Sequence, residues 1–104
     1  MRILITSVAN KKEAKKLSKR LVKKGLAACV SSFSAKSIYL WQEKLFGEKE
    51  QILLIKTDAK FKKVAKFIRK HHSYETPEIL SLKPKEIFKK YKTWIKKSTK
   101  KGKK

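Results

Sequence analysis

The chain has 104 residues, with 30 Lys or Arg against 8 Asp or Glu, so its formal net charge is +22 at pH 7. Hydrophobic residues make up 40% of the chain, which excludes a purely basic disordered tail, since such a tail lacks the side chains of a core. The length fits one domain, and no apolar run approaches the roughly 18 residues of a membrane span. The single cysteine, Cys29, excludes an intrachain disulfide and indicates a reducing compartment, so we expect a cytoplasmic protein without a membrane partner.

The type of basic residue limits which binding partners the charge can indicate. Lys outnumbers Arg 27 to 3, whereas specific recognition of phosphates and guanine edges favours the planar guanidinium. A solvated lysine surface is therefore expected, together with non-specific association with polyanions at low salt. A basic nucleic-acid-binding module stays an open alternative. Lysines are concentrated in residues 96–104, which are predicted to form a basic tail after a single domain over residues 1–95.

The first elements follow from local patterns. Residues 2–8 are apolar and β-branched, which predicts a strand. Asn10 is a predicted helix N-cap, and Glu13 three residues later completes a capping box. Apolar residues then recur at helical spacing as far as Gly25, where a left-handed residue is expected to end the helix.

The middle of the chain predicts three further strands, over residues 26–33, 37–45 and 50–57. Gly47 marks the turn between the last two. The run over residues 52–55 is wholly apolar, which predicts a central strand covered on both faces.

The last third of the chain predicts a strand between two helices. Asp58 is expected to cap a helix whose apolar repeat begins at Phe61. A strand follows over residues 78–83, and Pro84 opens a final helix. The apolar stripe of that helix consists of Ile87, Phe88, Tyr91, Trp94 and Ile95. The predicted fold class is α+β, a ferredoxin-like βαββαβ sandwich with an extended hairpin and an additional C-terminal helix.

Enzyme chemistry is not expected. Glycine occurs only at positions 25, 47 and 102, so the chain has no Gly-rich phosphate loop. Cys29 lies in an apolar strand, which predicts a buried and unreactive thiol.

The stretch with the greatest chemical capability is residues 71–78, His-His-Ser-Tyr-Glu-Thr-Pro-Glu. The imidazoles of His71 and His72 together with a carboxylate are ligands that copper and zinc accept. The alternative is a helix C-terminus that favours imidazolium, followed by a Pro-limited loop in which Tyr74 packs inward. Neighbouring helical residues point about 100° apart, so both imidazoles can bind one ion only if the helix breaks between them.

Four motifs in order resemble the CutA family of divalent-cation tolerance proteins. They are Leu-Ala-Ala-Cys at 26–29, Ser-Ile-Tyr-Leu-Trp at 37–41, Ile-Lys-Thr at 55–57 and His-Ser-Tyr-Glu-Thr-Pro-Glu-Ile at 72–79. The resemblance extends from about residue 2 to Trp94. The family usually has Pro where this chain has Ser73, and some members carry a second thiol where this chain has Thr6.

The resemblance implies a non-enzymatic homotrimer that acts in tolerance of divalent cations, copper above all. It implies no obligatory cofactor, with copper or another divalent cation as the ion bound. Cation binding is then expected at Cys29, His71 and His72. The matching motif residues are Tyr39, Trp41, Lys56, Tyr74, Glu75, Pro77, Glu78, Tyr91 and Trp94. A trimer that signals through a small anionic metabolite in its subunit clefts is a further alternative, by analogy of fold alone.

Overall fold

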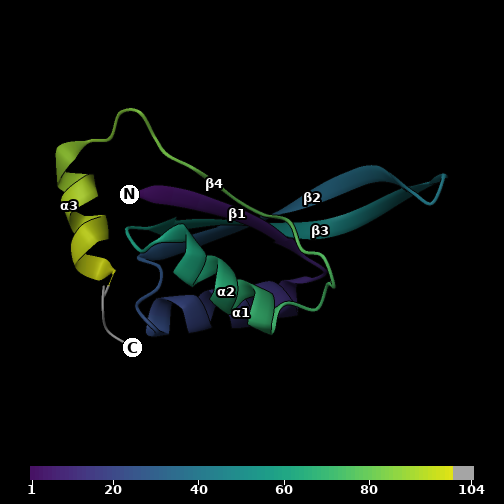
Figure 1. The fold of residues 1–104 in the computed structure, drawn as a ribbon, viewed down its shortest axis with the longest axis horizontal. Helices are drawn as coiled ribbons and strands as arrows, with labels where there is room; N and C mark the ends of the chain where they lie inside the picture. Colours follow the sequence, from purple (N-terminus) through teal and green to yellow (C-terminus); the bar gives the residue numbers. More distant parts are fainter. Residues whose placement is uncertain (100–104) are drawn as a thin grey trace.

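A computed structural model describes residues 1–99 of the chain. In chain order its elements are β1 (Arg2–Val8), α1 (Lys11–Lys23), β2 (Cys29–Trp41), β3 (Lys44–Thr57), α2 (Phe61–His71), β4 (Ile79–Leu82) and α3 (Lys89–Ser98). The strands form one antiparallel sheet in the order β2-β3-β1-β4. Both α1 and α2 cover one face of this sheet, and α3 lies across one end (Figure 1). This arrangement is the predicted ferredoxin-like α+β fold with an extra C-terminal helix.

The hydrophobic core lies between the two helices and the sheet. Because side chains alternate along a strand, every second residue of β1 and β3 faces the helices. The buried apolar residues of this layer include Leu4, Val8, Ala14, Leu17, Leu21, Leu53, Ile55, Val64 and Ile68. Ile52 and Leu54 point to the other face and are only partly buried. The prediction that this run is covered on both faces is therefore wrong for the single chain as far as residues 1–99 describe it, since α1 and α2 lie on the other face and α3 lies across one end of the sheet.

The ends of α1 follow the sequence prediction in most respects. Asn10 is the N-cap, and its Oδ1 accepts a hydrogen bond from the Glu13 backbone N–H at 2.8 Å. Gly25 has a φ of 74°, the left-handed conformation expected after the helix. The capping box is only half formed, because the Glu13 carboxylate accepts hydrogen bonds from Ser73 instead. This side chain thereby joins α1 to the loop after α2.

The start of α2 differs from the prediction. Its N-cap is Lys60, which makes no side-chain capping bond, and not Asp58. The Asp58 carboxylate lies 3.3 Å from the N-terminal ammonium group of Met1. The chain leaves β3 through a short turn in which Thr57 Oγ1 accepts a hydrogen bond from the Ala59 N–H at 2.9 Å. This turn delays the helix by two residues.

Most of the two predicted strands, over residues 26–33 and 37–45, merges into the one strand β2, whereas residues 44–45 belong to β3. β2 pairs with β3 without interruption from Cys29 opposite Lys56 to Trp41 opposite Lys44. The turn lies at Gln42 and Glu43, whose φ angles are 50° and 67°, and not at Gly47, which sits within β3. Continuous long-range pairing thus overrides the polar segment that predicted a break.

Beyond the end of β1, the β2–β3 hairpin continues as a two-stranded ribbon. β1 pairs with β3 only as far as Val8 opposite Gln51. The ribbon extends well past the rest of the sheet (Figure 1), and the longest dimension of the molecule is 45 Å. The sequence predicted an extended hairpin, and the structure confirms it.

The final helix begins later than predicted. α3 starts at Lys89, five residues after Pro84, and residues 83–88 between β4 and α3 are irregular. Ile95 alone of the predicted stripe is fully buried, whereas Phe88, Tyr91 and Trp94 are exposed. The helix continues through Ser98, across the predicted boundary between residues 95 and 96; residues 100–104 of the predicted tail lie outside the described residues. No helix in residues 1–99 combines the length and apolarity of a membrane span.

Candidate functional site

The two histidines lie where α2 ends. His71 is the last helical residue, and His72 is the C-cap with an extended backbone, φ −93° and ψ 142°. The helix therefore breaks between them, which is the condition that joint binding of one ion requires. The side chains nevertheless turn to different partners.

His72 ties the loop after α2 to β1. Its Nε2 lies 2.7 Å from the Ser7 carbonyl oxygen, and its Nδ1 lies 3.0 Å from the Tyr74 backbone nitrogen. The carbonyl accepts and the amide donates, so these partners assign the proton to Nε2 and the lone pair to Nδ1. The ring also contacts the Tyr74 ring, with centroids 4.9 Å apart. Both ring nitrogens are therefore engaged in holding the loop.

His71 lies against Arg20 of α1. Its Nδ1 is 2.7 Å from Arg20 Nη1, and its ring packs on Phe67 with centroids 4.4 Å apart. Because the guanidinium can only donate, His71 accepts this bond as a neutral imidazole. Burial lowers the pKa of His71, and the positive charges of Arg20 and three nearby lysines lower it further. The same charges oppose the approach of a dication.

Cys29 is the first residue of β2 and lies opposite Lys56. Lys56 Nζ is 4.0 Å from Cys29 Sγ and 2.6 Å from Ser31 Oγ. The thiol is half-buried and not buried as predicted, because it lies on the face of the sheet without helices.

The structure does not bring Cys29 together with the histidines. In the sheet register, Cys29 lies level with Ile3, two strands away. Ser7, which binds His72, is four residues farther along β1, a separation of about 13 Å along the strand. Within residues 1–99, no three His, Cys, Asp or Glu side chains form a group that could hold a metal ion. Cys29, His71 and His72 thus do not fit a shared metal centre within one chain.

A carboxylate pair at the base of the hairpin was not identified from the sequence. Glu50 accepts hydrogen bonds from Ser37 Oγ at 2.6 Å and from the Tyr74 hydroxyl at 2.9 Å, while Glu48 accepts one from the Tyr39 hydroxyl at 2.9 Å. Burial and the Glu50 carboxylate raise the pKa of Tyr74, and the bond to Glu48 raises that of Tyr39. The signal in the sequence was the spacing of two, which places both carboxylates on one face of a strand.

The other motif residues have simpler surroundings. Trp41 is exposed on the hairpin, and Glu75 and Glu78 are exposed in the loop that contains Pro77. The rings of Tyr91 and Trp94 stack on α3 with centroids 6.0 Å apart, and both are partly exposed. Most of these side chains are therefore exposed to solvent in the single chain.

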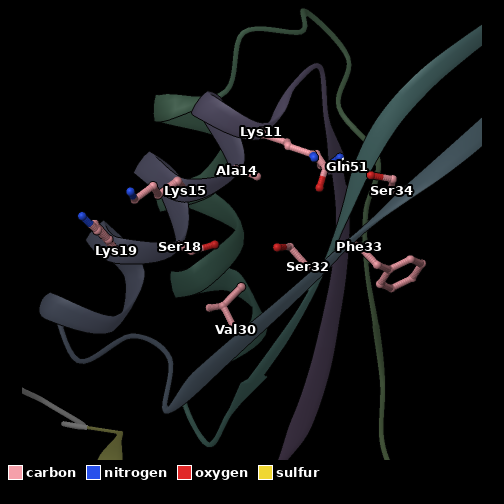
Figure 2. A pocket seen from close by; sticks show the side chains of 10 residues that line it. All are labelled: Lys11, Ala14, Lys15, Ser18, Lys19, Val30, Ser32, Phe33, Ser34 and Gln51. Carbon is pink, nitrogen blue, oxygen red and sulfur yellow. Dashed lines mark hydrogen bonds between the residues drawn. The ribbon is translucent and has the colours of Figure 1, made fainter.

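Two open grooves flank α1. The first, of about 550 Å³, lies between α1 and the outer strand β2. Figure 2 shows Lys15, Lys19 and Ser18 on the helix side of this groove and Ser32 on the strand side, while Phe33 points away from it. The second, of about 430 Å³, lies between α1 and the C-terminal end of α2 and includes His71 and Arg20.

Several known proteins resemble this chain over nearly its whole length. The chain is 31% identical over 99 residues to the divalent-cation tolerance protein CutA of Thermotoga maritima, covering 94% of this chain and 98% of that protein. The crystal structure of CutA1 from Pyrococcus horikoshii has a TM-score of 0.91 at 26% identity and covers 97% of this chain and 100% of that chain.

A second solved structure is named as the periplasmic divalent cation tolerance protein CutA from Archaeoglobus fulgidus. It has a TM-score of 0.92 at 31% identity and covers 96% of this chain and 100% of that chain. The model of a family described as CutA1 divalent ion tolerance protein matches residues 2–98. The chain therefore belongs to the CutA1 family.

Proposed function

We propose that this chain acts as a non-enzymatic cytoplasmic homotrimer in the tolerance of divalent cations. Family membership supports the cation role, because the relatives are named divalent-cation tolerance proteins. The relatives do not share one compartment by name, since one solved structure is called periplasmic. The cytoplasmic location rests instead on the single cysteine, which leaves no intrachain disulfide. Fractionation of cells that express the chain tests it, and recovery with the periplasmic or organellar fraction would contradict it.

The observation that carries the trimer is an apolar sheet face that neither α1 nor α2 covers within residues 1–99. Opposite the helices, this face carries Ile3, Ile5, Leu54, Phe33 and Leu80. Phe33 is 49% exposed and Leu80 41% exposed. A sheet face normally buries its apolar side against another layer. A second and a third copy of the chain supply that layer.

The hairpin gives independent support for the trimer. A two-stranded ribbon alone is marginally stable in water, yet here it carries Leu40, Trp41 and Leu45 at 70%, 62% and 73% exposure. The tip is thus rich in large apolar side chains that the single chain leaves in solvent. Packing of each hairpin against neighbouring subunits buries them and closes the exposed strand edges.

Light scattering coupled to size-exclusion chromatography tests the assembly. The expected mass is three times the 12.1 kDa of one chain, in buffer of high enough salt to suppress charge effects. A monomer at all salt concentrations would contradict the proposal.

Copper is the first cation to test, because imidazole and thiol groups are ligands it accepts. The assignment of Cys29, His71 and His72 as ligands stays a prediction. His71 offers Nε2, which has no hydrogen-bond partner within residues 1–99, so further ligands must come from another subunit or from solvent. In calorimetric titration, copper should bind more weakly to His71→Gln than to wild type. Cys29→Ser is the second variant, and weaker binding is expected there too. Equal weak binding by all three would contradict the assignment.

A nucleic-acid role has one specific observation in its favour. Tyr39 and Trp41 are both exposed on the hairpin of the single chain, and the chain as a whole carries a net charge of +22. Exposed aromatic rings near lysines are a feature of single-strand binders. If the hairpin is buried in a trimer, this surface is removed, so the mass measurement also discriminates between the two functions.

A further inference from the structure

The groove between α1 and the end of α2 carries an excess of positive charge. Its volume is about 430 Å³, and its charged lining includes one carboxylate, Glu13. The basic side chains that line it are Lys12, Lys16, Arg20 and Lys70. The three from α1 are spaced by four residues and thus lie along one face of the helix.

None of these four cations is neutralised within residues 1–99. The ion pair described there joins the Met1 ammonium to Asp58 and lies elsewhere. Glu13, the nearest acid in the groove, accepts hydrogen bonds from Ser73 N–H at 3.1 Å and Ser73 Oγ at 3.0 Å. It therefore closes one side of the groove and holds the loop in place.

Arg20 is oriented into this groove. Its Nη1 lies 2.7 Å from His71 Nδ1, which fixes the guanidinium at the end of α2 and uses one of its five N–H donors. Arg20 is one of three arginines in a chain with 27 lysines. A guanidinium presents paired donors that match the oxygens of a phosphate or carboxylate, whereas ammonium groups supply charge alone.

Three of the cations that line this one groove come from two helices: Lys16 and Arg20 of α1 and Lys70 of α2. His71 accepts the Arg20 hydrogen bond and adds no negative charge to offset them. An anion bound there replaces repulsion among these cations by attraction.

We propose that this groove binds a compact phosphate-bearing anion, held by Arg20, Lys16 and Lys70, with His71 as the positioning partner of Arg20. The groove is lined by residues of α1, of the end of α2 and of the segments next to them, and these two helices cover one face of the sheet (Figure 1). The apolar face is the opposite one. The groove thus stays accessible when the apolar face is covered by other copies. The site does not depend on a role in metal tolerance.

Calorimetric titration with inorganic pyrophosphate at constant ionic strength of about 0.15 M tests the site. The groove variant is Lys16→Gln with Arg20→Gln. The matched control is Lys62→Gln with Arg69→Gln, which removes the same two charges from exposed positions of α2 outside the groove. Thermal unfolding of each variant verifies the fold, and Lys16→Gln alone serves if the double variant unfolds.

Wild type is expected to bind one pyrophosphate per chain, with about tenfold or greater loss of affinity in the groove variant, because two charge-assisted contacts disappear. The control should stay within about twofold of wild type, since only long-range attraction changes. Equal losses in both variants, or no saturable binding by wild type, would overturn the site. A short oligothymidylate is the second probe. If it binds through the groove while pyrophosphate does not, the ligand is nucleic acid and the proposal is wrong.

Discussion

The Tyr74 hydroxyl donates a hydrogen bond to Glu50 Oε2 at 2.9 Å and thereby joins the loop after α2 to the base of the hairpin. Ser37 Oγ donates to the other oxygen of the same carboxylate at 2.6 Å. One acid thus connects three segments that are distant in sequence. In a chain with 8 acidic residues, such a carboxylate is a scarce acceptor.

Tyr74→Phe is expected to lower the free energy of unfolding by about 1–2 kcal/mol, because it removes a hydrogen bond to a charged acceptor. Glu50 still accepts its hydrogen bond from Ser37, so the carboxylate is not left without a partner. The pKa of Tyr74 is raised above its ordinary value of 10.0 by burial first and by Glu50 second. As pH rises, the unfolded chain therefore loses this proton first. The stabilisation is fully present below about pH 10 and is lost as pH rises through the folded-state pKa.

Urea unfolding between about pH 9 and 11 measures both effects. Wild type should lose more stability over this range than Tyr74→Phe, since the variant has no phenol at this position. Equal losses would show that the titration of Tyr74 is not the cause.

Two buried threonines differ in whether the hydroxyl has a hydrogen-bond partner. Thr6 is fully buried, and its Oγ1 has no hydrogen-bond partner within residues 1–99. Thr6→Val should therefore raise the free energy of unfolding by about 1 kcal/mol, because the desolvation cost of the hydroxyl disappears. Thr57 is the matched control, since it is equally buried but its Oγ1 donates to the Leu26 carbonyl at 2.6 Å. Thr57→Val should lower stability by about 1–3 kcal/mol, and a rise in both variants would contradict the argument.

The hairpin shows which part of the fold sequence reasoning could not reach. Gly47 is the residue there most suited to a turn, yet Gln42 and Glu43 adopt the positive φ angles. Uninterrupted pairing from Cys29 to Trp41 sets the position of the turn. Such pairing is a property of two strands together, so the local preferences of either one do not reveal it. Helix α1 was predicted closely because its cap and apolar repeat are local signals.

In the candidate site, too, local sequence signals predict some features and contacts between distant residues determine the others. The sequence identified the histidine stretch as chemically capable, but not the partners of its rings. Ser7 is 65 residues from His72 in sequence, and Arg20 is 51 residues from His71. These distant contacts decide that His72 holds a loop and that His71 faces a cation. No spacing within residues 71–78 could have revealed either role.

The position of His71 gives a prediction for NMR titration. Its imidazole pKa should lie below the ordinary 6.5, because burial and four neighbouring cations disfavour the charged ring. Arg20→Gln should raise this pKa without restoring 6.5, since burial is the larger cause and remains. The depressed pKa also means that stability is lost as pH falls through it, because the unfolded chain binds the proton more readily. An unchanged pKa in Arg20→Gln would exclude that contact as a cause.

The hairpin tip gives a prediction for assembly. Trp41→Gln with Leu45→Gln removes two large apolar side chains that are exposed in the single chain. In a trimer that buries them, each loses about 1.5–3 kcal/mol of burial per subunit, so light scattering should show a shift from three chains toward one. Val22→Gln is the control, because Val22 is also exposed but lies on α1, away from the sheet face. A hairpin variant that keeps the wild-type mass and concentration dependence would exclude this surface from the interface.

The net charge of +22 predicts binding to polyanions. Lysines act as point charges, so binding to single-stranded DNA should be independent of base sequence and driven by release of counterions. If six or more phosphates are neutralised, affinity should fall about 10³-fold or more between 50 and 200 mM salt. Fluorescence anisotropy with two oligonucleotides of unrelated sequence measures both properties. Binding that prefers one sequence and survives 200 mM salt would contradict a non-specific surface and favour a dedicated nucleic-acid site instead, because contacts to base edges depend far less on salt than contacts to phosphates do.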